Sequence, residues 1–275
     1  MNNYFEYSDD IISAHYSHNE RPNPKHFKLH IHEWYEIYYF INGSGLFKVE
    51  GNSYPLESGS ILIMRSNESH YIDINPERPY TRISVHFNPK LLADIDPQGI
   101  LMLPFTKRDG GKLNLYNSSD FKGSLYHTLI QNMTVSTNER RVQLLSNLIP
   151  ILNEIRIAFE GKNKTVESSE NSTICNIMNY INQHYSEDIS LDIICDKFFI
   201  SKSQLSRTFK LATGSTVWKY VTTKRIISAH ELIMLGQSPT EIYSKCGFND
   251  YSSFFRAYKK HYGTPPTQVR SSEPQ

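Results

Sequence analysis

The sequence predicts two domains of different class, an all-β barrel or sandwich with flanking helices followed by an all-helical half. Three observations predict this division. Short β-rich runs alternate with turn dipeptides between about residues 28 and 88, the polar stretch GKNKTVESSENS occupies residues 161–172, and helical patterns follow it. The 275 residues also exceed the usual single-domain length of roughly 100 to 150. We therefore expect domains at residues 1–160 and 173–275, joined by a linker at 161–172.

The β-rich part is indicated by strands that lie close together in sequence. The runs EIYYFI, LFKVE, SYPLE and SILIM are separated by short turns, among them Asn42-Gly43 and Gly51-Asn52. Glycine adopts positive φ without a steric penalty, so these dipeptides suit tight hairpins. Strands joined by hairpins pair antiparallel, which predicts a small antiparallel barrel or sandwich.

A helical pattern follows within residues 119–159. Its apolar residues are spaced three and four apart, which places them on one helical face: Leu145, Leu148, Leu152, Ile155 and Phe159. We expect this helix to kink or restart at Pro150, because proline lacks a backbone N–H donor. The apolar face has two alternative uses, packing on the β-domain or forming the seam of a homodimer.

Composition excludes several classes of protein. No segment approaches the ~20 apolar residues of a membrane span, and MNNYFEYSDD lacks the features of a signal peptide, so we expect a cytoplasmic protein with no membrane partner. The three cysteines, Cys175, Cys195 and Cys246, form no CxxC pair, which suits small buried apolar residues in a reducing compartment. The net charge of +1 does not indicate a partner by itself.

Helix start and stop signals fill residues 173–275. Two serines suit N-caps and two glycines suit C-terminal stops: Ser190, Ser201, Gly214 and Gly263. A long helix is expected at roughly 216–235, after which Ser238-Pro239 opens another short helix and GFND makes a turn. A short helix, a turn and a second helix thus occur on either side of one long helix. This pattern predicts two helix-turn-helix units.

In a helix-turn-helix unit the second helix enters the major groove of DNA. The pairs Leu205 with Phe209 and Phe254 with Tyr258 are expected to point inward. The polar residues left facing out are the candidate DNA contacts: Ser203, Gln204, Ser206, Arg207, Lys210, Tyr251, Ser252, Ser253, Arg256 and Lys259. Arginine and glutamine recognise base edges, whereas serine, tyrosine and lysine mostly contact phosphates. The alternative is that these are ordinary solvated helix faces.

Three stretches of this half resemble the AraC/XylS family of transcription regulators. They are SLDIICDKFFISKSQLSRTFKLATG, KRIISAHELI and CGFNDYSSFFRAYKKHYGTPP, followed by Arg270. The resemblance covers about residues 174–270. It implies that the two units sit at either end of a linker helix and enter successive major grooves, with base contacts from Ser203, Ser206, Arg207, Tyr251, Ser252, Ser253 and Arg256. A helix of roughly 20 residues spans ~30 Å, close to the ~34 Å between successive grooves.

The chain departs from this family pattern at three positions. Cys195 and Tyr243 stand where the family usually has a small alanine, and Val269 stands where a tyrosine commonly precedes the final arginine. The bulky Tyr243 puts the packing angle of the second unit in doubt.

The N-terminal half carries a second resemblance, beginning at HIHEWYE. His30, His32, Glu36 and Gly43 form the pattern HxHxxxEx6G, which resembles the first cupin motif. Gly59 and His70 resemble the second motif, although Arg65, Asn67 and Ile74 depart from its usual residues. The resemblance implies a cupin-like barrel in which His30, His32, Glu36 and His70 are candidate ligands of a divalent metal, with His70 arriving from a neighbouring strand.

AraC-like regulators often use such a barrel as an effector pocket, and this resemblance implies a second role for the same residues. The candidate effector-binding residues are His30, His32, Trp34, Glu36, Tyr38, His70 and His86, with Phe40 on the same wall. An aromatic wall suits a sugar or an amphipathic ligand, but it equally suits a simple core. Effector bonding, metal binding and ordinary buried histidines therefore remain alternatives.

Together these observations predict a ligand-responsive transcription regulator, an activator by default, and not an enzyme. Its expected partners are double-stranded promoter DNA, a small and sugar-like effector, RNA polymerase and a second copy of the chain in a homodimer. One rival is a cupin metalloenzyme with an appended helical domain, which leaves the C-terminal half unexplained. Another is a DNA-binding protein whose barrel serves only dimerisation.

Overall fold

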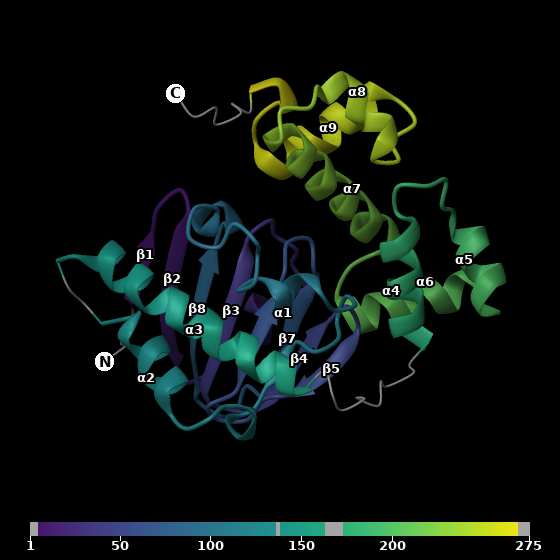
Figure 1. Ribbon diagram of the computed structural model, residues 1–275. Coiled ribbons are helices and arrows are strands. Elements are labelled where there is room, and N and C mark those ends of the chain that lie inside the picture. Colours follow the sequence, from purple (N-terminus) through teal and green to yellow (C-terminus); the bar gives the residue numbers. More distant parts are fainter. Residues whose placement is uncertain (1–4, 136–137, 163–172, 269–275) are drawn as a thin grey trace. The chain divides into compact units, whose positions relative to one another are not determined.

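The computed structural model describes residues 5–135, 138–162 and 173–268. The contacts of the chain separate two compact units, one of residues 1–28 with 34–170 and the other of residues 29–33 with 171–275. Figure 1 shows a β-rich part with flanking helices and an all-helical part, which confirms the predicted fold class. Of the expected linker at 161–172, the first two residues end a helix and the other ten lie outside the described residues.

The β-rich part contains two sheets. The six-stranded sheet has the order β1-β2-β8-β3-β6-β9, and the three-stranded sheet has the order β5-β4-β7. The strands are β1 (Phe5–Ser8), β2 (Ile12–Asn19), β3 (Tyr35–Asn42), β4 (Gly45–Val49), β5 (Asn52–Pro55), β6 (Ile61–Met64), β7 (His70–Ile74), β8 (Tyr80–Phe87) and β9 (Leu115–Tyr116). Every ladder between these strands is antiparallel, as hairpin-connected strands require.

The larger sheet is buried on both faces. Alternate residues of β3 point to opposite sides, so that Tyr38 and Phe40 join an apolar cluster with residues of the smaller sheet such as Phe47. Ile37 and Tyr39 join a second cluster on the other side, which includes residues of α2 (Leu125–Asn132) and α3 (Arg140–Lys162). Double burial explains why EIYYFI is apolar nearly throughout and does not alternate with polar residues.

Helix α3 covers the outer face of the larger sheet. Leu148, Leu152, Ile155 and Phe159 are all buried in the same cluster as the sheet residues. These residues therefore pack on the β-domain, and this supports the first of the two alternative uses of the predicted apolar face. Of the two predicted effects of Pro150, a kink or a restart, the restart does not occur, because α3 runs from Arg140 to Lys162 with Pro150 inside it. Burial of the neighbouring side chains outweighs the one missing backbone hydrogen bond.

The helical part begins and ends its helices where the local signals predicted. Its helices are α4 (Thr173–His184), α5 (Leu191–Phe198), α6 (Lys202–Thr213), α7 (Val217–Met234), α8 (Pro239–Lys245) and α9 (Tyr251–Tyr262). The hydroxyl oxygens of Ser190 and Ser201 each accept a hydrogen bond of 3.2 Å from a backbone N–H of the first helical turn. Gly214 and Gly263 end α6 and α9 with φ of 70° and 76°.

Two apolar cores stabilise this part, and α7 contributes to both. Leu205 and Phe209 of α6 lie in the first core, and Phe254 and Tyr258 of α9 lie in the second, as predicted. The remaining short elements are α1 (Leu103–Thr106) and the 3-10 turns Pro24–His26, Pro89–Leu92, Ser118–Asp120 and Pro266–Gln268. Within the described ranges, no helix is both long enough and apolar enough to cross a bilayer.

Phe199 links α5 to α6 in the left-handed region, with φ 53° and ψ 44°, and its relative exposure is 95%. A non-glycine residue is destabilised by roughly 1–2 kcal/mol in this backbone conformation. Glycine avoids that strain, but its greater loss of chain entropy on folding offsets about 0.5–1 kcal/mol of the gain. We expect Phe199→Gly to raise the free energy of unfolding by up to about 1 kcal/mol in urea denaturation. Phe199→Ala keeps the Cβ atom and should bring no gain. Equal stability of Phe199→Gly and Phe199→Ala would show that the left-handed backbone at residue 199 does not destabilise the native chain.

Candidate effector site and DNA-binding helices

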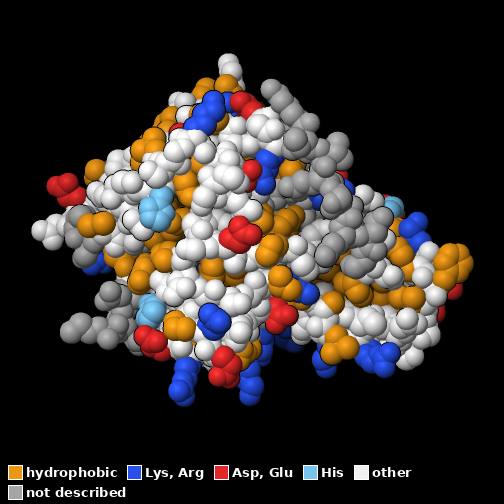
Figure 2. All heavy atoms as spheres, turned by 90° about the horizontal axis from the view of Figure 1, so that it is seen from below, with side chains coloured by type: hydrophobic (Ala, Val, Ile, Leu, Met, Phe, Trp, Pro, Cys, Tyr) orange, Lys and Arg blue, Asp and Glu red, His pale blue; other side chains and the backbone are white. Residues whose placement is uncertain are grey.

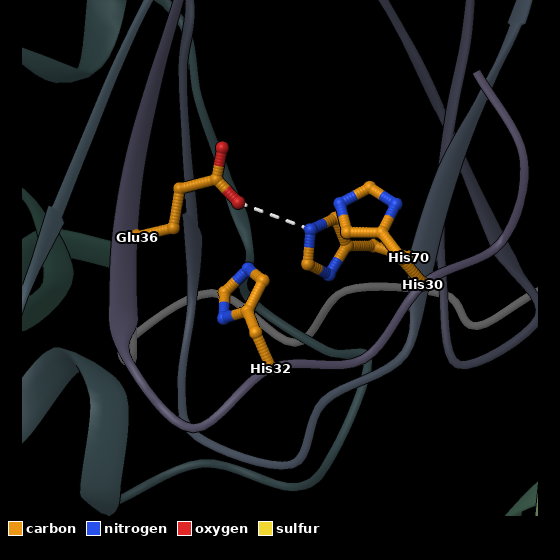
Figure 3. Close-up of side chains that lie close together, drawn as sticks. All are labelled: His30, His32, Glu36 and His70. Atoms are coloured by element: carbon orange, nitrogen blue, oxygen red, sulfur yellow. Dashed lines mark ion pairs between the residues drawn. The ribbon is translucent and has the colours of Figure 1, made fainter. Parts of the chain in front are cut away.

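A buried carboxylate, Glu36, lies between the two sheets near one end of β3. The register places it opposite His86 of β8, and Glu36 Oε2 is 3.6 Å from His86 Nε2. On the smaller sheet His70 begins β7, and its Nε2 is 3.0 Å from the same oxygen (Figure 3). Glu36 and His70 have relative exposures of 4% and 1%. The expectation that His70 arrives from a neighbouring strand was wrong, because β7 pairs with β4 in the other sheet.

The four residues of the cupin-like pattern lie together. One ligand atom from each of His30, His32, Glu36 and His70 falls within 4.8 Å of the others. Figure 3 shows the four side chains gathered at one place. His30 and His32 precede β3, so they lie outside the strand that carries Glu36. His30 is exposed and His32 is half-buried, in contrast to the other two.

The backbone fixes the orientation of the His70 ring. Its Nδ1 donates a hydrogen bond of 2.9 Å to the carbonyl oxygen of Glu68, so Nε2 is the nitrogen that faces Glu36. A neutral ring would present a lone pair to the carboxylate at that nitrogen, whereas an imidazolium donates an N–H. Burial lowers the pKa of His70, but the hydrogen bond and charge of Glu36 outweigh burial and raise it above its ordinary value. Either a proton or a cation thus suits the space between Nε2 and the carboxylate.

The loop that presents His70 is held by a buried ion pair that the sequence analysis missed. Both carboxylate oxygens of Glu68 accept hydrogen bonds from the Arg108 guanidinium, at 2.7 and 2.6 Å. The backbone N–H of Gly111 and the side-chain amide of Asn114 also donate to Glu68, at 2.7 and 3.2 Å. Burial raises the pKa of Glu68, but Arg108 and these donors outweigh it and lower the pKa to about 2. The partners lie 40 residues apart, and no local motif connects them.

The other candidate effector residues differ in their surroundings. Tyr38 has a relative exposure of 2%, belongs to the apolar cluster between the sheets with Phe40, and shares a hydrogen bond between its hydroxyl and that of Tyr80. Trp34 is half-buried, and the side chain of His86 keeps a relative exposure of 29%. The polar groups at this site are therefore a carboxylate and imidazoles, which can bond the hydroxyls of a ligand or coordinate a cation.

The predicted outward residues of the first helix-turn-helix unit are all exposed on α6: Ser203, Gln204, Ser206, Arg207 and Lys210. On α9, Ser252, Arg256 and Lys259 are exposed, whereas Tyr251 and Ser253 are half-buried. The Ser253 hydroxyl donates to the carboxylate of the N-cap residue Asp250 at 2.8 Å, so it takes part in helix capping.

Tyr251 is half-buried because it packs on its neighbours. Its ring meets that of Tyr243 edge to face, with 5.9 Å between centroids, and it also contacts Phe254. Tyr243 itself is half-buried at the margin of the second core. The bulky side chain at this family position is therefore accommodated against α9. Cys195 is buried, and Val269 and Arg270 lie outside the described residues.

Charge does not by itself mark the DNA-binding surface. On the face drawn in Figure 2, basic and acidic side chains of the described residues are interspersed with polar and apolar ones. The exposed arginines of α6 and α9 therefore indicate the predicted DNA-binding surface better than the overall charge does, because they lie on the second helix of each unit.

A β-domain with a polar cluster between its sheets, together with paired helix-turn-helix units, defines a ligand-sensing DNA-binding protein. Comparison with known families agrees with this class. Residues 15–151 match the AraC-like ligand binding domain, and residues 194–272 match a helix-turn-helix domain, so the two matches cover more than half of the chain. The chain belongs to the AraC family of transcription regulators. It is thus a regulator and not an enzyme, with one domain for a small-molecule effector and one for DNA.

Curated relatives include the HTH-type transcriptional activator RhaS of Enterobacter sp. strain 638, which is 22% identical over 247 residues. The match covers 89% of this chain and 87% of that protein. RhaS of Escherichia fergusonii is 24% identical over 255 residues, with the same coverage. Among solved structures, fatty acid-bound ToxT of Vibrio cholerae is 15% identical over 95% of both chains, with a TM-score of 0.43. A protein of unknown function from Listeria innocua is 30% identical over 36% of this chain and 94% of its own length, with a TM-score of 0.34.

The Glu68–Arg108 pair predicts how the stability of the β-domain depends on pH. Because folding lowers the pKa of Glu68 from 4.5 to about 2, the pair contributes fully above pH 4.5, and its contribution is lost as the pH falls toward 2. Glu68→Gln should lose about 3–5 kcal/mol at neutral pH, since it leaves the Arg108 charge buried without its partner. Urea denaturation at pH 5.5 and pH 3 should then show a smaller pH-dependent decrease in this variant than in the native chain.

The matched control is Glu57→Gln, at an exposed carboxylate of the same domain. Its effect on stability should stay within about 0.5 kcal/mol. Equal pH dependence in the Glu68→Gln variant and the native chain would contradict the role given to this pair.

Proposed function

We propose that this protein is a transcription activator whose effector is bound by the cluster around Glu36, and whose DNA contacts come from α6 and α9. The observation that carries the effector assignment is the buried Glu36–His70 contact at 3.0 Å. A carboxylate removed from water needs a compensating partner, and sites that keep such groups buried are commonly binding sites. The names of the curated relatives support activation, because RhaS is described as an activator.

The effector favoured by this chemistry is a small hydroxylated molecule, such as a sugar. The Glu36 carboxylate accepts hydrogen bonds from hydroxyl groups, and the imidazoles of His70 and His86 donate or accept them. His30 and His32 add two further imidazoles to the same group. A hydroxylated ligand would replace the direct Glu36–His70 contact by bonds to both groups, so binding would change the spacing of the two sheets at this end.

A divalent cation is the second candidate, and one observation favours it specifically. The ring of His70 donates through Nδ1 to a backbone carbonyl and keeps Nε2 toward the cluster, which is the arrangement that orients metal-binding histidines. Three imidazoles and one carboxylate would suit Zn²⁺ or a similar transition metal. In this case the cation would serve as effector or as a structural ion, and the protein would remain a regulator.

On the DNA side, we propose that Arg207 and Arg256 contact base edges in successive major grooves. The remaining exposed residues of α6 and α9 would position the protein on phosphates. A homodimer, contact with RNA polymerase and a cytoplasmic location belong to the same proposal, since they follow from activation at a promoter. Effector binding would act by shifting the population of DNA-binding arrangements.

Arg207→Ala and Arg256→Ala test the placement of the recognition helices. Each should weaken binding to a duplex selected by the full-length chain from a random DNA library by about 1–3 kcal/mol, and each should relax the preference at its own bases. Fluorescence anisotropy measures the affinity, and repeated selection measures the preference. Arg78→Ala, at an exposed position between β7 and β8, is the matched control and should bind as the native chain does. Native affinity in both arginine variants would refute the placement.

Glu36→Gln tests the effector site. A panel of neutral sugars and divalent cations should contain a ligand that stabilises the native chain, by about 2.7 kcal/mol at 100-fold excess over its Kd. Thermal denaturation should show that Glu36→Gln loses this stabilisation. The control Asp73→Asn lies at an exposed position on β7 and should keep it.

The class of ligand that stabilises the native chain separates the two candidates. Stabilisation by a sugar supports the leading proposal, and stabilisation by a cation alone supports the second. A ligand that stabilises Glu36→Gln as well as the native chain would place the effector elsewhere.

A further inference from the structure

A five-residue segment, Leu29–Glu33, precedes β3 in sequence but belongs by its contacts to the helical unit. We call this segment the strap. The chain thus leaves the β-domain after residue 28, contributes the strap to the DNA-binding unit, and returns at Trp34. Only Trp34 and Tyr35 separate Glu33 from the candidate effector residue Glu36.

The first attachment of the strap is apolar. Ile31 has a relative exposure of 9% and belongs to the core of the first helix-turn-helix unit, which includes Ile177 of α4, Leu205 of α6 and Tyr220 of α7. Leu29 packs against the same core. Burial of an isoleucine side chain in an apolar core is favourable, so this contact anchors the strap.

The second attachment is polar and involves the other end of α7. Glu33 Oε2 is 3.0 Å from His230 Nε2, and the side chains of these residues have relative exposures of only 27% and 13%. The hydroxyl of Tyr262, the last residue of α9, lies near this carboxylate, and burial together with the Glu33 charge raises the pKa of Tyr262. The rings of His230 and Tyr262 are stacked with their centroids 4.4 Å apart. His230 in turn shares a hydrogen bond with Tyr258, which lies in the second core.

Within five residues the strap therefore contacts both helix-turn-helix units. Ile31 joins it to the first core, and Glu33 joins it to the histidine and tyrosines of α7 and α9. The remaining residues, His30 and His32, belong to the candidate effector group. Leu29, Ile31 and Glu33 thus contact the DNA-binding unit. His30 and His32, which alternate with them, are candidates to bind the ligand.

We propose that the strap sets the relative arrangement of the two helix-turn-helix units and is the route by which the effector site changes DNA binding. This inference rests on the proposed function of that site. The two units must enter successive major grooves together, so a segment attached to both governs how well they fit one duplex. Because His30 and His32 alternate with Ile31 and Glu33 along the strap, a ligand held by the two histidines would act on both attachments of the strap.

Glu33→Gln in the full-length chain tests this inference without a known effector. Two duplexes are compared, one selected from a random library with sites for both units and one carrying the site of the first unit alone. Removing the charge should change affinity for the two-site duplex by at least about 5-fold, the lower end of usual coupling between sites. Affinity for the single-site duplex should change less than about 2-fold, since only one unit binds it and the arrangement of the two helix-turn-helix units does not affect the fit.

Tyr262→Phe removes the polar hydroxyl near Glu33 while keeping the ring stacked on His230, and it should shift two-site affinity in the same direction. Combined with Glu33→Gln it should add little, because both changes remove one contact. Circular dichroism and thermal denaturation verify that each variant is folded. Glu57→Gln is the matched loss of one carboxylate outside the strap and should bind both duplexes as the native chain does.

The outcomes separate the two proposals. If the native chain selects no duplex, the proposed function fails. If it selects a duplex and both strap variants bind that duplex with native affinity, the strap inference alone is overturned. A loss of affinity that is equal for the two-site and single-site duplexes would also overturn it, since such a loss reflects general damage to the domain.

Discussion

The β-domain depends on how a carboxylate is accommodated between two sheets. Strand β3 is covered on both faces, so a charged residue on it cannot reach bulk water, and Glu36 has a relative exposure of only 4%. Burying an ion is strongly unfavourable unless opposite charge or hydrogen-bond donors compensate. His70 and His86 supply that compensation from the two sheets. The candidate site is therefore a direct consequence of the double burial of β3, and a ligand competes with an interaction that the protein already makes.

The second buried ion pair has a different role from the first. Glu68 and Arg108 satisfy nearly all of their hydrogen-bonding capacity with each other and with the surrounding loops. A network satisfied in this way is rigid, and it holds the carbonyl oxygen that orients His70. Glu36 faces the ionisable rings of His70 and His86. The protein thus combines a rigid support with an adaptable binding group only a few residues away.

Local signals in the sequence predicted the helical half well. Ser190, Ser201 and Gly214 act through neighbours within four residues, so their roles can be read without knowledge of the fold. The strand segments followed from β-rich runs between turn dipeptides, and the inward side chains of α6 and α9 followed from helical periodicity. The composition of the candidate site was also predictable, because three of its four residues lie within seven positions.

Other features depend on contacts between distant parts of the chain and were not predictable. The pairing of Glu68 with Arg108, the placement of His70 on the opposing sheet and the contact of Glu33 with His230 have no local pattern. Pro150 shows the limit of a local signal, since of the two predicted outcomes, a kink or a restart, the restart does not occur in a helix whose apolar face is buried. Tyr251 and Ser253 were expected to be exposed, but both are half-buried. Tyr251 packs on Tyr243, and Ser253 bonds the N-cap residue Asp250.

Helix α7 has consequences for how the sequence of this protein can change. Tyr220, Val221 and Ile227 lie in one core, and Ile226, Ala229 and Ile233 lie in the other. A substitution at any of the seven apolar residues that α7 buries must therefore satisfy one of two separate packing environments. The outer residues of α6 and α9 face no such restriction. Substitutions at the exposed positions of those two helices can accordingly alter the preferred DNA sequence without disturbing either core that α7 joins.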